Sequence, residues 1–135
     1  MTTRLAFAAL ALAALPLAGC ATVTAVPDAP QADRGWPEGS AVALGQPVKV
    51  GNVVATPMKV VEDSRCPINA RCVWAGRLIV ETRIDGAGWR DTANITLGET
   101  YGTHGNVIAL VSGEPGRTTQ QPTPPEAYRF VYEAR

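Results

Sequence analysis

Apolar and polar residues alternate along several short segments after residue 45, and a period of two predicts β-strands. The pattern is clearest in residues 73–85, where two sets of alternating positions differ in character: Leu78, Val80, Thr82 and Ile84 against Arg77, Ile79, Glu81 and Arg83. This pattern is typical of a strand with one face in a core and the other in water, whereas a helix would mix the two sets. Residues 86–88 predict a turn and residues 89–97 a returning strand, so the sequence predicts a β-hairpin.

Four other segments predict strands: residues 48–50, 58–61, 107–112 and 128–133. The apolar run at 107–112 predicts a strand covered on both faces, while residues 98–106 and the proline-rich residues 114–126 predict loops. No segment has a helical period, and the 13 glycines and 11 prolines suit a turn-rich domain. The sequence therefore predicts an all-β fold: a small antiparallel β-sandwich or barrel of six to seven strands in a single domain.

The first residues do not belong to this domain. One positive side chain, Arg4, precedes an apolar run from Leu5 to Leu17. That run has the length of a signal-peptide core and is too short to cross a bilayer as a permanent helix. The following residues, Leu17-Ala18-Gly19-Cys20, resemble the lipobox of bacterial lipoproteins. The alternative is an ordinary cleaved signal followed by an incidental cysteine.

The lipobox resemblance implies that residues 1–19 are removed and that Cys20 is acylated, which would attach the protein to a membrane by several acyl chains. Ala21 follows the cysteine, and in the sorting rule of enterobacteria-like lipoproteins the lack of Asp there favours the outer membrane, facing the periplasm. Residues 20–39 predict a disordered tether and residues 40–135 the β domain. Trp36 stands out in the tether, and it either packs on the domain edge or binds a partner.

Charge excludes one class of function. Without the leader, which contains Arg4 and no acid, 11 basic and 12 acidic residues remain of the 12 and 12 in the whole chain, a net charge of −1. Nucleic-acid binding requires a basic surface, so this protein is not expected to bind nucleic acid. The same balance argues against electrostatic adsorption to a membrane surface.

Two cysteines remain once Cys20 is assigned to lipid. Cys66 and Cys72 lie in the segment RCPINARC of an exported domain, where a disulfide is the expected state. A redox-active pair is the alternative, but the CxxC spacing is missing. A zinc site would need further ligands that do not cluster here.

The residues around this pair, DSRCP (63–67) and CVWAG (72–76), resemble a motif of small exported bacterial proteins, often lipoproteins. The resemblance implies a type of domain and not a reaction. Two interpretations stay open. In the first the motif is structural, with Trp74 covering the disulfide and an arginine paired with an acid or stacked on Trp74. In the second Arg65, Arg71 and Trp74 form a recognition surface, because Arg and Trp are enriched in binding hot spots.

Catalytic chemistry is sparse. The single histidine, His104, lies in a predicted loop without a GxSxG motif, so it is only a weak candidate for a metal or catalytic site. The sequence predicts no cofactor and a non-enzymatic envelope module that binds a protein, a glycan or a small molecule. The alternatives are a metal-handling or hydrolytic protein that uses His104, an inhibitor of an envelope-lytic enzyme, and a purely structural component.

Overall fold

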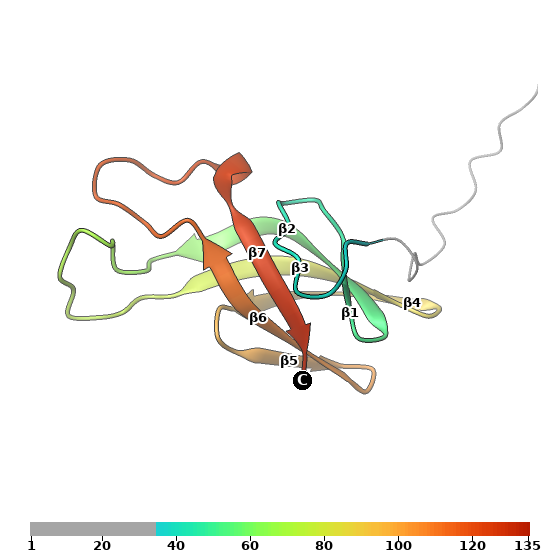
Figure 1. The fold of residues 1–135 in the computed structure, drawn as a ribbon. Coiled ribbons are helices and arrows are strands. Elements are labelled where there is room, and N and C mark those ends of the chain that lie inside the picture. The colour runs from blue at the N-terminus through green and yellow to red at the C-terminus, as the bar shows by residue number, and fades with distance from the viewer. Residues whose placement is uncertain (1–34) are drawn as a thin grey trace, which may run out of the picture.

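The computed structural model describes residues 35–135, and within this range the chain forms seven β-strands and one helical turn. In chain order these are β1 (Val48–Val50), β2 (Val53–Asp63), β3 (Leu78–Gly86), β4 (Trp89–Thr96), β5 (Thr100–Thr103), β6 (Asn106–Glu114), the 3-10 turn η1 (Pro125–Ala127) and β7 (Arg129–Ala134). Strands β1 to β4 form one antiparallel sheet and β5 to β7 a second (Figure 1). The prediction of an all-β antiparallel fold is confirmed.

The hairpin of β3 and β4 is the best-predicted part of the fold. Gly86 pairs with Trp89, so Ala87 and Gly88 alone make the turn. Gly88 has a φ of +79°, a backbone conformation that glycine adopts without strain. The alternate positions that the sequence assigned to the core are all buried: Leu78, Val80, Thr82 and Ile84.

Both sheets contribute to one hydrophobic core. The largest fully buried side chains include members of the first sheet and of the second: Leu78, Ile84 and Ile95 on one side, Ile108, Leu110, Phe130 and Tyr132 on the other. Across this core the hydroxyl groups of Thr82 and Tyr132 lie 2.8 Å apart and share a hydrogen bond. The bond satisfies two buried polar groups and links β3 to β7.

Several predicted element bounds were wrong. Residues 73–77 are not part of β3, which begins at Leu78. The predicted loop 98–106 contains β5, which pairs with β6 through Thr100–Thr103. β2 begins at Val53, five residues before the predicted strand. The prediction missed residues 53–57 because all five are buried, so they show no alternation of apolar and polar positions. The strand predicted at 107–112 is covered on both faces only at its centre, since Val107 is exposed.

The folded part of the chain begins before Ser40, which corrects the predicted end of the tether. Trp36 forms a parallel bridge with Val48 of β1, and its backbone makes hydrogen bonds of 2.9 Å to Pro47 and 2.8 Å from Lys49. Glu38 accepts hydrogen bonds from the backbone of Gly51 and of Ala134. These contacts hold residues 36–38 on the β1 edge. The remainder of the predicted tether, the leader and Cys20 lie outside the described residues.

No helix within residues 35–135 is long and apolar enough to cross a membrane.

Candidate functional site: a disulfide-stapled loop

The segment from Ser64 to Arg77 connects β2 to β3, and we call it the stapled loop. Cys66 and Cys72 form a disulfide inside it, with their Cα atoms 5.8 Å apart, which confirms the predicted bond. At its base the backbone of Ser64 donates to Arg77 and that of Cys66 donates to Ala75, each at 2.8 Å. The loop is therefore closed twice, by backbone pairing at the base and by the disulfide nearer the tip.

Gly76 makes the narrow base possible. Its φ is +68°, and a Cβ atom at this position would collide with the backbone carbonyl of Ser64. Only glycine combines this backbone conformation with so close an approach. The chain changes direction at Gly76, two residues before β3 begins. This explains why the alternation in residues 73–77 does not produce a strand.

Arg65 holds the base of the stapled loop in place. Its guanidinium donates two hydrogen bonds of 2.8 Å to the carboxylate of Asp63. The same group donates to the carbonyl oxygens of Gly113 and Pro115, at and after the end of β6. The Arg65 side chain is 16% exposed and that of Asp63 8%. Arg65 was predicted as a binding residue, but in the structure its donors are engaged within the domain, which makes it a connector between the two sheets.

Tyr128 completes this arrangement, which we call the Asp63 cluster (Asp63, Arg65 and Tyr128). Its hydroxyl donates to the Asp63 carboxylate at 2.7 Å. Burial alone would raise the pKa of Asp63, but the hydrogen bonds from Arg65 and Tyr128 outweigh burial and lower it. Burial and the Asp63 charge raise the pKa of Tyr128. The charged carboxylate is thus the state that the fold stabilises.

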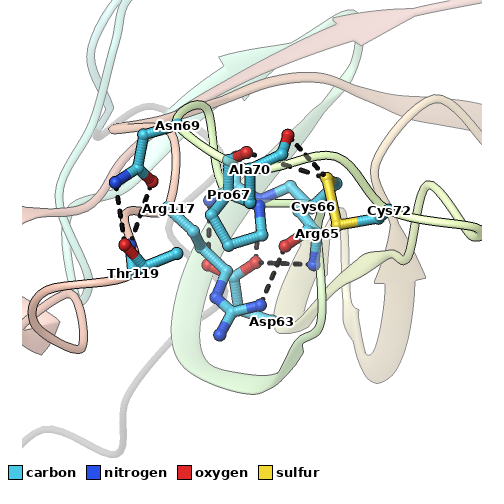
Figure 2. The surroundings of a disulfide bond; sticks show 9 residues. All are labelled: Asp63, Arg65, Cys66, Pro67, Asn69, Ala70, Cys72, Arg117 and Thr119. Atoms are coloured by element: carbon cyan, nitrogen blue, oxygen red, sulfur yellow. Dashed lines mark hydrogen bonds and ion pairs between the residues drawn. A yellow bond between two sulfur atoms is a disulfide. The ribbon is translucent and has the colours of Figure 1, made fainter.

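A second loop braces the first. Residues 115–124, the proline-rich loop, follow β6 and lie beside the stapled loop at one end of the domain (Figure 1). The backbone of Ile68 donates to Arg117 at 2.9 Å, and Arg117 donates from its side chain to the carbonyl of Arg65 at 2.8 Å. Asn69 and Thr119 exchange two hydrogen bonds, of 2.8 and 3.1 Å, as Figure 2 shows. The stapled loop therefore has a supported backbone despite its projection from the sheet.

The stapled loop exposes large apolar side chains. Val73 is 95% exposed, Trp74 83% and Ile68 77%. We call these three residues the apolar tip; Ile68 lies beyond the disulfide, and Val73 and Trp74 lie between Cys72 and the backbone pairing at Ala75. The structural interpretation of Trp74 was that it covers the disulfide, and its exposure contradicts that interpretation. Scattered exposed apolar residues are ordinary, but three within seven positions of a braced loop are typical of an interaction surface.

Arg71 also lies on the exposed part of the stapled loop. No residue of the described range 35–135 makes a hydrogen bond or ion pair with it. Of the three predicted binding residues, the structure thus leaves Arg71 and Trp74 available and engages Arg65. The prediction missed Ile68 and Val73: Val73 was assigned to a strand, and nothing in the sequence distinguishes an isolated Ile68 from a buried residue.

A shallow groove of about 380 Å³ runs along the proline-rich loop and borders the stapled loop at Pro67. Its other lining residues are mostly polar: Arg117, Thr118, Thr119, Gln120, Gln121 and Pro122. A second hollow, about 320 Å³, lies at the other end of the first sheet against Gly35, Trp36, Pro37 and Pro47. Trp36 is 57% exposed there, so its backbone joins the domain while its side chain faces solvent.

His104 lies in the two-residue turn between β5 and β6. His104 and Gly105 have φ values of 47° and 76°, the left-handed conformation that such hairpin turns require. The imidazole stacks on the ring of Trp89, with centroids 4.0 Å apart, and its Nδ1 lies 2.9 Å from the hydroxyl of Thr103. Nowhere in the part of the chain that the structure describes do three or more His, Cys, Asp or Glu side chains gather as metal ligands would.

Comparison of the chain with models of protein families, with curated proteins and with solved structures finds no match. The fold and the site define this protein as a small two-sheet β domain that presents a disulfide-stapled loop with an apolar tip.

Proposed function

We propose that this chain is a lipid-anchored envelope protein whose domain binds a partner through the stapled loop and carries out no reaction. The observation that carries the proposal is the exposure of the apolar tip on a loop that the disulfide and the proline-rich loop hold in place. Preordering matters because a loop that is fixed before binding loses less conformational entropy when it binds. The lipobox residues, ending at Cys20, support the lipid anchor, and Ala21 in place of Asp supports a position at the outer membrane, facing the periplasm.

The position of the stapled loop suits an anchored protein. The chain enters the described domain at Gly35, and Trp36 pairs with β1, which lies against the first residues of β2. The stapled loop leaves β2 at Asp63, eight residues beyond Ala55, which is about 26 Å along an extended strand. A protein held from its N-terminal side would therefore present the stapled loop away from the membrane.

The alternative that uses His104 for metal binding or hydrolysis has less support. The imidazole is engaged by Trp89 on its face and by Thr103 at Nδ1. The left-handed backbone of His104 is the conformation that the hairpin turn requires, so its position in the fold needs no catalytic explanation. The inhibitor hypothesis agrees with the main proposal, because an inhibitor of a lytic enzyme would be a protein that binds its target through such a loop.

Photo-crosslinking in the native envelope tests the proposal. A photoreactive residue replaces Arg71, and the control replaces Asn94, which is exposed on β4. Arg90 of the same strand is a poor control because it pairs with the buried Asp85. An adduct at position 71 that is absent at position 94 is expected, and equal labelling at both would contradict the proposal. In the same cells, Cys20→Ser is expected to abolish labelling by a fatty-acid analogue.

A further inference from the structure

The chemistry of the apolar tip discriminates between classes of partner. Ile68 and Val73 are aliphatic and gain free energy only when an apolar surface removes them from water. A glycan presents mainly hydroxyl groups, which would lose hydrogen bonds to water against an aliphatic side chain without replacement. A glycan-binding loop would use Trp74 beside polar groups. Two exposed aliphatic side chains on the same loop as the tryptophan favour a protein.

The shape of the loop indicates what that protein offers. The stapled loop projects from one end of the domain (Figure 1). The backbones of Cys66 and Ala75 pair near its base. Its side is braced by Asn69 and Thr119 (Figure 2). Side chains that are 77–95% exposed on a fixed backbone are fully buried only by a concave surface. The complementary feature is therefore a cleft.

Charge adds a further requirement. The stapled loop contains three arginines and no acidic residue. Arg65 pairs with Asp63 and Arg77 pairs with Glu62 at 3.0 Å, so both are neutralised within the domain. Arg71 has no such partner among residues 35–135 and leaves one positive charge beside the apolar tip. Complementary potentials steer association and exclude wrong partners, so the partner's rim carries negative charge.

We propose that the partner is a protein with an apolar cleft that has a carboxylate at its rim, and that Val73 and Trp74 insert into the cleft while Arg71 pairs with the carboxylate. This inference rests on the proposed function and adds the class and chemistry of the partner.

The first experiment uses the full-length lipidated chain in its own membrane, with a photoreactive residue at Val73. The matched control places the same residue at Val61, which is 46% exposed on β2 and lies outside the stapled loop. Each adduct sample is divided: one half is treated with a glycan hydrolase, and the other is digested with trypsin and searched for crosslinked peptides by mass spectrometry. The inference predicts one discrete adduct from position 73 that the glycan hydrolase leaves intact and whose crosslinked partner peptide lines a cleft.

The second experiment measures the affinity of the captured protein for variants of the chain. Trp74→Ala is expected to weaken binding by at least about 30-fold, the loss typical of a hot spot, while Trp36→Ala leaves it unchanged. Arg71→Glu is expected to weaken binding at least about tenfold and to remove its dependence on salt, whereas Arg71→Lys retains it. Thermal unfolding of each variant checks that it is folded. The melting temperature should not change, because these exposed side chains do not stabilise the fold.

The outcomes separate the inference from the proposed function. An adduct that the glycan hydrolase returns to the size of the free chain overturns the inference but leaves a module that binds its partner through the stapled loop. Equal labelling at Val73 and Val61 overturns both. A protein adduct whose affinity does not change in Arg71→Glu overturns the acidic rim, and one whose affinity does not change in Trp74→Ala overturns the insertion.

Discussion

The carboxylate of Asp63 and the guanidinium of Arg65 face each other through two hydrogen bonds of 2.8 Å at the point where β2 ends. Since Arg65 also donates to the carbonyls of Gly113 and Pro115, this one pair ties the stapled loop to the far end of β6. A bidentate pair fixes orientation as well as distance. The direction in which the apolar tip projects therefore depends on residues that lie outside it.

Asp63→Asn is expected to lower the free energy of unfolding by about 2–3 kcal/mol, because it leaves the partly buried Arg65 without its counter-charge. Urea denaturation measures the loss. The control is Glu81→Gln, which breaks a surface pair with Lys59 and should change stability by less than about 0.5 kcal/mol. Equal effects of the two substitutions would show that the Asp63 cluster contributes no more to stability than a surface ion pair.

The same carboxylate makes stability depend on pH. The pKa of Asp63 is lower in the folded protein than in the unfolded chain, so its contribution is complete above the ordinary aspartate pKa of about 4. The contribution is lost as the pH falls through that value towards the lower pKa of the folded state. We therefore expect the wild-type protein to lose stability in acid more steeply than Asp63→Asn. Parallel stability curves from pH 6 to pH 3 would contradict this expectation.

The hydrogen bond between Thr82 and Tyr132 is expected to stabilise the packing of the two sheets. Tyr132→Phe should cost about 1–2 kcal/mol, because the hydroxyl of Thr82 then loses its partner across the core and keeps only a 3.3 Å bond to Val80. Thr82→Val retains the shape of the side chain and removes its hydroxyl. In that background Tyr132→Phe should therefore be less destabilising. A double-mutant cycle measures the coupling, for which we expect about 1 kcal/mol. A coupling near zero would mean that packing alone holds the sheets together.

His104 is expected to act through its backbone and its ring rather than through metal or catalysis. Both His104→Gly and His104→Ala lose the stacking on Trp89. Only glycine keeps the left-handed φ without strain, so His104→Gly should be more stable than His104→Ala by about 1 kcal/mol. Chemical denaturation followed by Trp89 fluorescence, in a Trp36→Phe, Trp74→Phe background, measures the difference. Zinc binding that disappears in both variants would restore the metal hypothesis.

Replacing both cysteines of the Cys66–Cys72 disulfide by serine is expected to lower stability by about 2–2.5 kcal/mol, the chain-entropy value for so short a loop. The sheets should remain folded, because the core lies outside the stapled loop. A reducing agent should weaken the wild-type protein by the same amount and leave the double variant unchanged. A reductant effect on the double variant would point to a cause other than this bond.

The sequence by itself determined the features that depend on neighbouring residues. The hairpin of β3 and β4 was predicted because alternation and a two-residue turn are local properties. The Cys66–Cys72 bond was predicted from the short spacing and the exported context. The lipobox at Cys20 is likewise a local pattern, and the lipid anchor that it implies remains a prediction.

Only the tertiary structure decided which exposed residues form the candidate site. Val73 continues the alternation of β3 in sequence, yet it projects into solvent because Gly76 turns the chain against Ser64. β5 has little apolar character of its own and exists because β6 lies beside it. Arg65 was indistinguishable in sequence from Arg71, and the two differ because the carbonyls of Gly113 and Pro115 reach only the first. Such contacts join residues about fifty positions apart, and no local pattern records them.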